Sequence, residues 1–191
     1  MTHVRTRSIA TVGALCAAAA LSLPGAALAK GGTTAPPPST GNLLVNPGFE
    51  SGAAGWTQTA GVITNDTGAA PRTGSFYAWL DGYGTSHTDS VSQSVAIPAA
   101  TSATLSFHLK VSSAETTTAT TYDTLKVQVV SGTTTTTLAT YSNVNKGTTY
   151  VQRSVNLSAY TGRTVTVKLL GVEDSSAATS FLVDDTSLTT S

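Results

Sequence analysis

Hydrophobic and polar residues alternate with a period of two along most of the chain beyond residue 42. In the clearest stretch, Leu105, Phe107, Leu109 and Val111 are separated by Ser106, His108 and Lys110. The same alternation recurs at 76–80, 125–129 and 165–169, whereas helical spacing is hard to find. Successive side chains of a β-strand point to opposite faces, so this pattern predicts strands with one buried and one solvated face.

Turn-forming residues interrupt the alternation about every ten residues. They lie at Asp81-Gly82, Pro98, Ser131-Gly132, Lys146-Gly147, Thr161-Gly162 and Asp174-Ser175-Ser176. Short strands at this spacing, with no helix between them, are typical of a sandwich. The sequence therefore predicts an all-β fold, an antiparallel β-sandwich.

Two polar residues occupy positions that the alternation places on a buried face. Gln93 shares a face with Val91 and Val95, and Arg153 shares one with Val151. A buried amide or guanidinium without partners is too costly to persist. Either each residue lies at an edge or bulge with its polar end satisfied, or one inner face borders a ligand groove.

Residues 1–29 have the pattern of a secretory signal peptide. Arg5 and Arg7 precede an apolar, Ala-rich stretch at 9–23, and Ala27-Leu28-Ala29 fits the small-x-small cleavage rule. The apolar stretch is too short and too rich in Ala for a membrane anchor. We expect cleavage after Ala29 and a secreted, extracellular protein with no membrane partner.

The mature chain divides into a linker and one domain. Residues 30–41, KGGTTAPPPSTG, offer no apolar residue to a core and predict a flexible Gly/Pro/Thr linker. Residues 42–191 are enough for one domain whose core can carry the fold. Cys16 is the only cysteine and lies in the leader, so disulfides do not contribute.

Charge narrows the choice of partner. The whole chain has ten Lys/Arg and ten Asp/Glu residues, and loss of Arg5 and Arg7 leaves a net charge of about −2. No cluster of Lys or Arg remains, which argues against nucleic acid or an anionic membrane surface.

Both ends of the domain resemble a known family. Residues 42–50, NLLVNPGFE, with Gly52 and Gly55-Trp56 after them, resemble the opening strand of carbohydrate-binding modules with the galactose-binding-like jelly-roll fold. Residues 180–188, SFLVDDTSL, resemble their final strand, and 72–75 and 92–95 also fit the family pattern. The chain looks most like the non-catalytic modules appended to secreted bacterial peptidases and glycosidases. These motifs are specific for the fold and weak for the ligand.

The resemblance implies a structural calcium ion where the first and last strands lie side by side. It implies Glu50 and Asp184 as carboxylate ligands, Asp185 as the alternate to Asp184, and backbone carbonyls near Gly52 and Gly74. Calcium prefers several oxygen ligands, and two carboxylates brought together without a cation would repel each other. The alternative is that these acids are solvated charges at strand ends.

The other loops predict a second cluster of polar residues. Antiparallel strands bring alternate loops to one end, so 81–88, 112–121, 142–148 and 173–179 should lie together and gather most of the acids. A sugar site would use the rings of Tyr83 and Tyr122 with polar contacts from Asp81, Asp89, Asp123 and Asn145. A second cation could instead lie among Asp81, Asp89, Asp123 and Asp174, or the loops could be polar only because they face water.

Trp79 and Tyr77 point away from the face of Ala78 and Leu80. They predict either a flat binding platform on the sheet or a small second core under a neighbouring loop.

Motifs of catalysis are missing from the sequence. It has no Gly-x-Ser-x-Gly, no cysteine beside a histidine, and no His-x-x-x-His or Cys-x-x-Cys spacing. We therefore expect a monomeric, non-catalytic module that binds a polysaccharide or glycan. The alternative is an extracellular protein-interaction or cell-surface structural domain, related to peptidase appendages and partnered by a secreted hydrolase. A small hydrolase is a third hypothesis, because the separation of paired carboxylates cannot be seen in a sequence.

Overall fold

The computed structural model describes residues 41–191, so the predicted signal peptide and nearly all of the predicted linker lie outside the described residues. None of the helices in the described part is long and apolar enough to cross a membrane. The described elements are two short 3-10 helices, η1 (Asn143–Asn145) and η2 (Ser158–Tyr160), and the strands β1 (Thr57–Gln58), β2 (Ile63–Thr64), β3 (Tyr77–Asp81), β4 (His87–Ala96), β5 (Ala103–Ser113), β6 (Thr124–Ser131), β7 (Thr134–Ser142), β8 (Val151–Asn156), β9 (Thr164–Glu173) and β10 (Thr179–Thr190).

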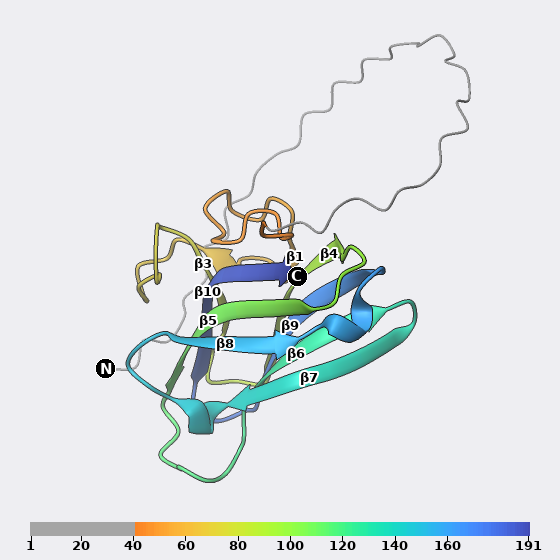
Figure 1. Ribbon diagram of the computed structural model, residues 1–191. Coiled ribbons are helices and arrows are strands. Elements are labelled where there is room, and N and C mark those ends of the chain that lie inside the picture. Colours follow the sequence, from red (N-terminus) through yellow and green to blue (C-terminus); the bar gives the residue numbers. More distant parts are fainter. Residues whose placement is uncertain (1–40) are drawn as a thin grey trace, which may run out of the picture.

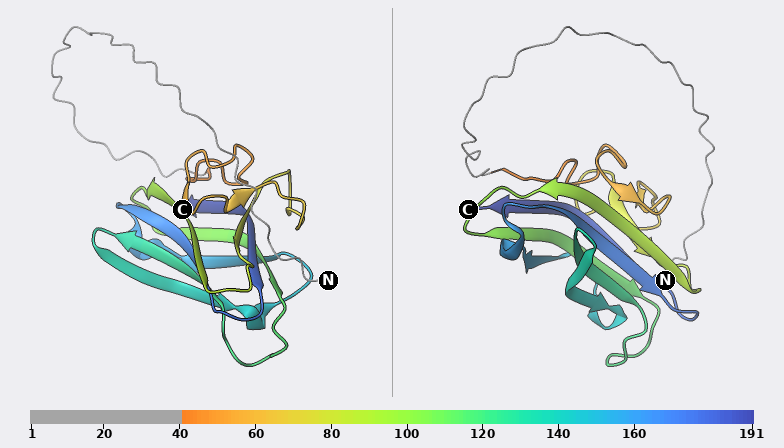
Figure 2. Two further views of the ribbon diagram at one scale, coloured as in Figure 1. Left: turned by 180° about the vertical axis from the view of Figure 1, so that it is seen from behind. Right: turned by 90° about the vertical axis from the view of Figure 1, so that its right-hand side faces the viewer.

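The strands form two five-stranded sheets (Figure 1). Sheet A has the order β1-β4-β9-β6-β7, and sheet B has the order β2-β3-β10-β5-β8. All paired strands are antiparallel. Figure 2 shows the layered arrangement from behind and from the side. The predicted fold class, an antiparallel β-sandwich, is confirmed.

The core lies between the two sheets and follows the predicted alternation. In β5, Leu105, Phe107, Leu109 and Val111 are buried, while the residues between them are only partly covered. Alternate residues of β6 and β9 face them from sheet A. Each such side chain contributes roughly 1.5–3 kcal/mol when fully buried. Burial of one face is therefore what imposes the period of two.

The opening segment lies beside β10, but it is not the strand that the resemblance implied (Figure 1). The Leu43 amide donates to the Leu188 carbonyl at 2.8 Å, and the Asn42 side chain bonds Thr186 and Leu188. Regular pairing cannot continue, because Asn46 (φ 51°) and Phe49 (φ 63°) have left-handed backbone conformations. The two ends of the domain are therefore neighbours, held by backbone and side-chain hydrogen bonds together.

The two polar residues predicted on inward faces both lie at the margins of the core, where Gln93 is hydrogen-bonded and Arg153 Nε has no hydrogen-bond partner within residues 41–191. The Gln93 amide accepts from the Val45 amide at 2.7 Å and donates to the Val45 carbonyl at 3.0 Å, much as a neighbouring strand would. Arg153 lies on β8, the edge strand of sheet B, with its guanidinium 5.2 Å from the centre of the Tyr141 ring. For Gln93, the interpretation of a satisfied polar end is correct.

Candidate functional site

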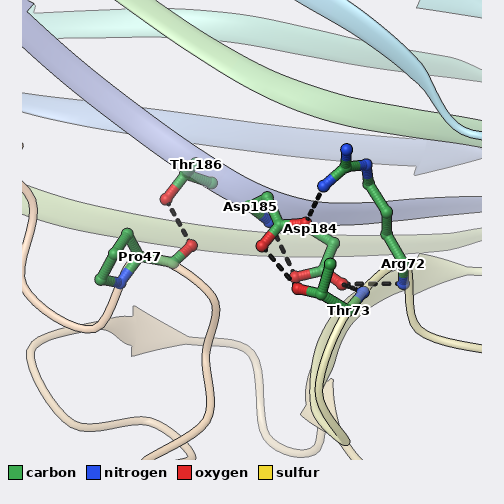
Figure 3. A network of polar contacts seen from close by, with 6 residues as sticks. All are labelled: Pro47, Arg72, Thr73, Asp184, Asp185 and Thr186. Carbon is green, nitrogen blue, oxygen red and sulfur yellow. Dashed lines mark hydrogen bonds and ion pairs between the residues drawn. The ribbon is translucent and has the colours of Figure 1, made fainter.

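Glu50 and Asp184, the two acids implied as calcium ligands, hold the same short segment of chain. The Asp184 carboxylate accepts from the backbone amides of Arg72 at 2.8 Å and Thr73 at 3.1 Å (Figure 3). The Glu50 carboxylate accepts from the amides of Ser75 and Phe76, each at 3.0 Å. One acid from each end of the domain thus converges on residues 72–76.

Gly74 leaves room for the Glu50 carboxylate. Its φ is +61°, and a Cβ placed there would lie 2.2 Å from Glu50 Oε1. No other residue fits without displacing that carboxylate. Gly52 also has a φ of +61°, and its carbonyl accepts from the Asn46 side chain at 2.8 Å. The positive φ at Gly74 thus makes room for the Glu50 carboxylate, whereas the Gly52 carbonyl is bonded to a side chain of its own loop.

Asp184 and Asp185 have different surroundings although they are adjacent. Asp185 forms an ion pair with Arg72 at 2.5 Å and accepts from the Thr73 hydroxyl at 2.7 Å (Figure 3). Asp184 is fully buried. Loss of water raises the pKa of the Asp184 carboxyl, while amide hydrogen bonds, above all that of Thr73, act in the opposite direction. The charge of the Asp185 carboxylate is thus offset by an arginine, whereas the Asp184 carboxylate is stabilised by hydrogen bonds from backbone amides.

The two carboxylates, one from each end of the domain, are of a ligand type suited to calcium. Within residues 41–191, no three acidic, histidine or cysteine side chains converge closely enough to hold a metal ion by themselves. An ion here would therefore depend on Glu50, Asp184 and backbone oxygens together.

At the opposite end of β3, the structure encloses four carboxylates. Asp81, Asp89 and Asp123 are 0% exposed and Glu173 is 1% exposed. The sequence predicted the first three as sugar contacts in open loops, and this prediction is wrong because all three are buried. Asp89 lies on the inward face of β4, and the left-handed backbone of Asp81 (φ 59°) departs from the extended alternation of β3. Such side chains cannot reach a ligand on the surface.

Backbone amides and hydroxyls stabilise part of this acidic cluster, defined as Asp81, Asp89, Asp123 and Glu173. Glu173 accepts from four amides, those of Gly82, Tyr83, Gly84 and Thr179. Asp89 accepts from the Asp81 amide and the Tyr83 hydroxyl, and it lies 3.2 Å from His87 Nε2. Asp123 Oδ1 accepts from the Asp174 amide.

Asp81 is the exception in the cluster. Neither of its carboxylate oxygens has a hydrogen-bond partner within residues 41–191, and Asp123 Oδ2 also has none there. Burial, then the charges of Asp89, Glu173 and Asp123, raise the pKa of Asp81 to about 8. Asp81 is therefore mostly protonated at neutral pH.

The loops gather at one end as predicted, and a few polar and aromatic groups remain open there. Ser176 donates to Glu115 from the neighbouring loop, and the Tyr122 amide donates to Asn143. Tyr122 is 48% exposed, and Asn145 is exposed although its side chain accepts from the Ser142 amide. Tyr83 is half-buried, with its ring 4.0 Å from that of His87. Tyr122 and Asn145 are the predicted contacts most open to a ligand.

Trp79 is covered by a loop and does not form an open platform. It is 3% exposed, stacks on Tyr77 at 6.1 Å and packs with Leu182 on the outer face of sheet B. Gly68 lies against its ring, and the loop is tied down by Tyr77, which donates to the Asp66 carbonyl at 2.8 Å, and Tyr150, which donates to the Ala70 carbonyl at 3.0 Å. Beside Trp79 the loop leaves a cavity of about 160 Å³.

Solved structures with the same architecture identify the fold. The module TmCBM61, solved in complex with β-1,4-galactotriose, is 18% identical with a TM-score of 0.55, and the match covers 78% of this chain and 99% of that one. The family 16 carbohydrate-binding module 2 is 23% identical with a TM-score of 0.51, over 77% of this chain and 99% of that one. This chain shares the β-sandwich fold of these two modules.

A third match is a named xylan-binding module. The CBM22-1 domain of Paenibacillus barcinonensis Xyn10C is 20% identical with a TM-score of 0.50, over 79% of this chain and 96% of that one. No protein-family model and no curated protein sequence matches the chain. The likeness is one of structure, and it confirms the jelly-roll sandwich that the terminal motifs indicated.

Three further residues belong to these sites: Glu173, which the sequence placed only among the acids gathered at one end, and Lys110 and Ser112, which it did not indicate. Glu173 lies an even number of residues after Val167 and Leu169 on β9, so it shares their inward face. This alternation was the sequence signal for its burial. Lys110 and Ser112 alternate outward on β5 and line the cavity beside Trp79. Nothing in the sequence indicated that a distant loop would enclose them.

Proposed function

We propose that this chain is a secreted, non-catalytic module that binds a glycan. The observation that carries the proposal is the structural likeness to isolated carbohydrate-binding modules over nearly their whole length, 99%, 99% and 96%. One of these modules was solved with a galactotriose and another is named for xylan. Export rests on the signal-peptide pattern of residues 1–29.

The distribution of aromatic residues favours sheet B and its adjoining loops as the binding surface. The outward residues of sheet A, on β4, β9, β6 and β7, are Ser, Thr, Lys, Gln and aliphatic residues. Sheet B carries Trp79 beside a cavity, and Tyr122 is exposed on the loop that follows β5. Sugar rings are held by an aromatic face together with a few polar groups.

A pull-down tests the proposal. The full mature chain is incubated with insoluble galactan, xylan, cellulose, chitin and peptidoglycan, and the bound fraction is measured. We expect retention on at least one polysaccharide. Tyr122→Ala should weaken it by about three- to tenfold, because an exposed ring contributes roughly 0.5–1.5 kcal/mol when it stacks. Tyr160→Ala, in η2 at the opposite end, is the control, with a melting temperature to verify folding because this tyrosine is partly buried against the core. Retention on none of the glycans would contradict the proposal.

We also propose a structural calcium ion at Glu50 and Asp184. Two observations support it, namely the convergence of both carboxylates on residues 72–76 and the space that Gly74 leaves for Glu50. Glu50, Asp184 and neighbouring backbone carbonyls would hold the ion. When bound, calcium supplies a positive charge that offsets carboxylate repulsion, with no part in catalysis. The protein residues meanwhile fix the loop and the two ends of the domain to one another.

A further inference from the structure

The cavity beside Trp79 is walled on one side by the loop at residues 66–70 and on the other by the outer face of sheet B. Gly68 and Ala69 form the loop wall, and Lys110, Ser112 and Ser180 line the sheet wall. The hydrogen bonds from Tyr77 and Tyr150 fix the loop in place. A cavity whose walls are anchored in this way is preformed, which lowers the entropic cost of binding a ligand.

Three polar side chains converge on this cavity. Ser112 and Ser180 are direct cross-strand partners on β5 and β10, and Lys110 lies two residues before Ser112 on the same face. Within residues 41–191, none of these three side chains makes a hydrogen bond or ion pair with the protein. They are therefore available to a ligand.

The charge in the cavity has one sign. Among residues 41–191, Lys110 is the only charged residue that lines it. The nearest acid of the loop, Asp66, uses a carboxylate oxygen to accept from the Gly68 amide at 2.7 Å. An unpaired ammonium in a partly enclosed polar site attracts an anion, and hydroxyl groups can donate to the same oxygens.

The volume of the cavity, about 160 Å³, matches a single sugar unit better than a long stretch of polysaccharide. We propose that this cavity takes a carboxylated sugar, a uronic acid at the end of a glycan chain, with Lys110 and the two serine hydroxyls on its carboxylate. The inference rests on the proposed glycan-binding function and names its ligand class.

Titration calorimetry with the full mature chain tests this. The ligands are oligogalacturonate, a glucuronic-acid-capped xylo-oligosaccharide, neutral galactotriose and a sulfated galactose oligomer. We expect a uronate to bind about tenfold or more tightly than the neutral sugar, with an affinity that falls as salt rises. Lys110→Gln should remove this preference, whereas Lys168→Gln on the outer face of sheet A should retain it. Melting temperatures of both variants verify that they fold.

The possible outcomes separate the two proposals. Equal binding of neutral and carboxylated sugars, or an uronate affinity unchanged in folded Lys110→Gln, overturns the uronate inference and leaves glycan binding standing. A preference for the sulfated oligomer over both uronates also overturns it. Failure of every sugar, together with failure in the polysaccharide pull-down, removes the proposed function itself.

Discussion

At the residue scale, Asp81 makes the stability of the domain depend on pH. Its pKa of about 8 in the folded state lies above the ordinary value of 3.8. Between these values the folded state holds a proton that the unfolded state releases, so stability falls as pH rises. Below pH 4 the free energy of unfolding changes little on account of this group. Above pH 8 the buried carboxylate is charged, and its full destabilising effect is present.

This pH dependence gives a measurable slope. The free energy of unfolding should fall by up to about 1.4 kcal/mol per pH unit between pH 4 and 8 on account of this one group. Asp81→Asn, which keeps the shape and tolerates a positive φ, should flatten the curve and raise stability at pH 8. Urea unfolding between pH 4 and 8 measures the free energy of unfolding of the wild type and of each variant, with Asp174→Asn as the control. A slope identical in wild type and Asp81→Asn would disprove the assignment.

Gly171 is a second residue on which the acidic cluster depends. A Cβ at this position would lie 2.1 Å from Asp81 Oδ2. We expect Gly171→Ala to destabilise the fold by roughly 1–3 kcal/mol through overpacking. In an Asp81→Gly background the same change should cost much less, because the clashing carboxyl is gone. Gly147→Ala, where a Cβ meets nothing within 4 Å, is the matched control. Equal costs in both backgrounds would contradict the contact.

At the element scale, the opening segment is held by Gln93 as well as by β10. The Gln93 side chain makes both hydrogen bonds with Val45. Gln93→Leu keeps the size but removes them, so we expect a loss of about 1–2 kcal/mol and faster amide exchange at Val45. Hydrogen exchange and urea unfolding measure these effects, with the exposed Ser94→Ala as control. Unchanged protection at Val45 would show that β10 alone holds the segment.

The strands could be predicted because burial of one face imposes a period of two, as in the run from Leu105 to Val111. The opening segment could not, since Asn46 and Phe49 adopt left-handed conformations that a pattern of apolar residues does not encode. The gathering of the loops at one end followed from strand reversal. The burial of Asp81 did not, because it depends on one positive φ and on the space at Gly171.

At the scale of the whole molecule, the two ends of the domain are joined through residues 72–76. If calcium is bound there, its removal should lower the melting temperature, because a ligand that binds only the folded state stabilises it by mass action. Thermal melting in 1 mM calcium and in excess chelator measures the shift. Glu50→Gln should abolish the shift, and Glu115→Gln should preserve it. A melting temperature indifferent to chelator in the wild type would refute the calcium proposal.

The central claim is that this module recognises sugars, and calorimetry tests that function most directly. The full mature chain is titrated with soluble oligosaccharides of galactan, xylan and their uronate-containing forms. The account predicts a saturable heat with one site per chain for at least one of them. Heats no greater than those of dilution for every oligosaccharide, from a chain that melts cooperatively, would contradict it.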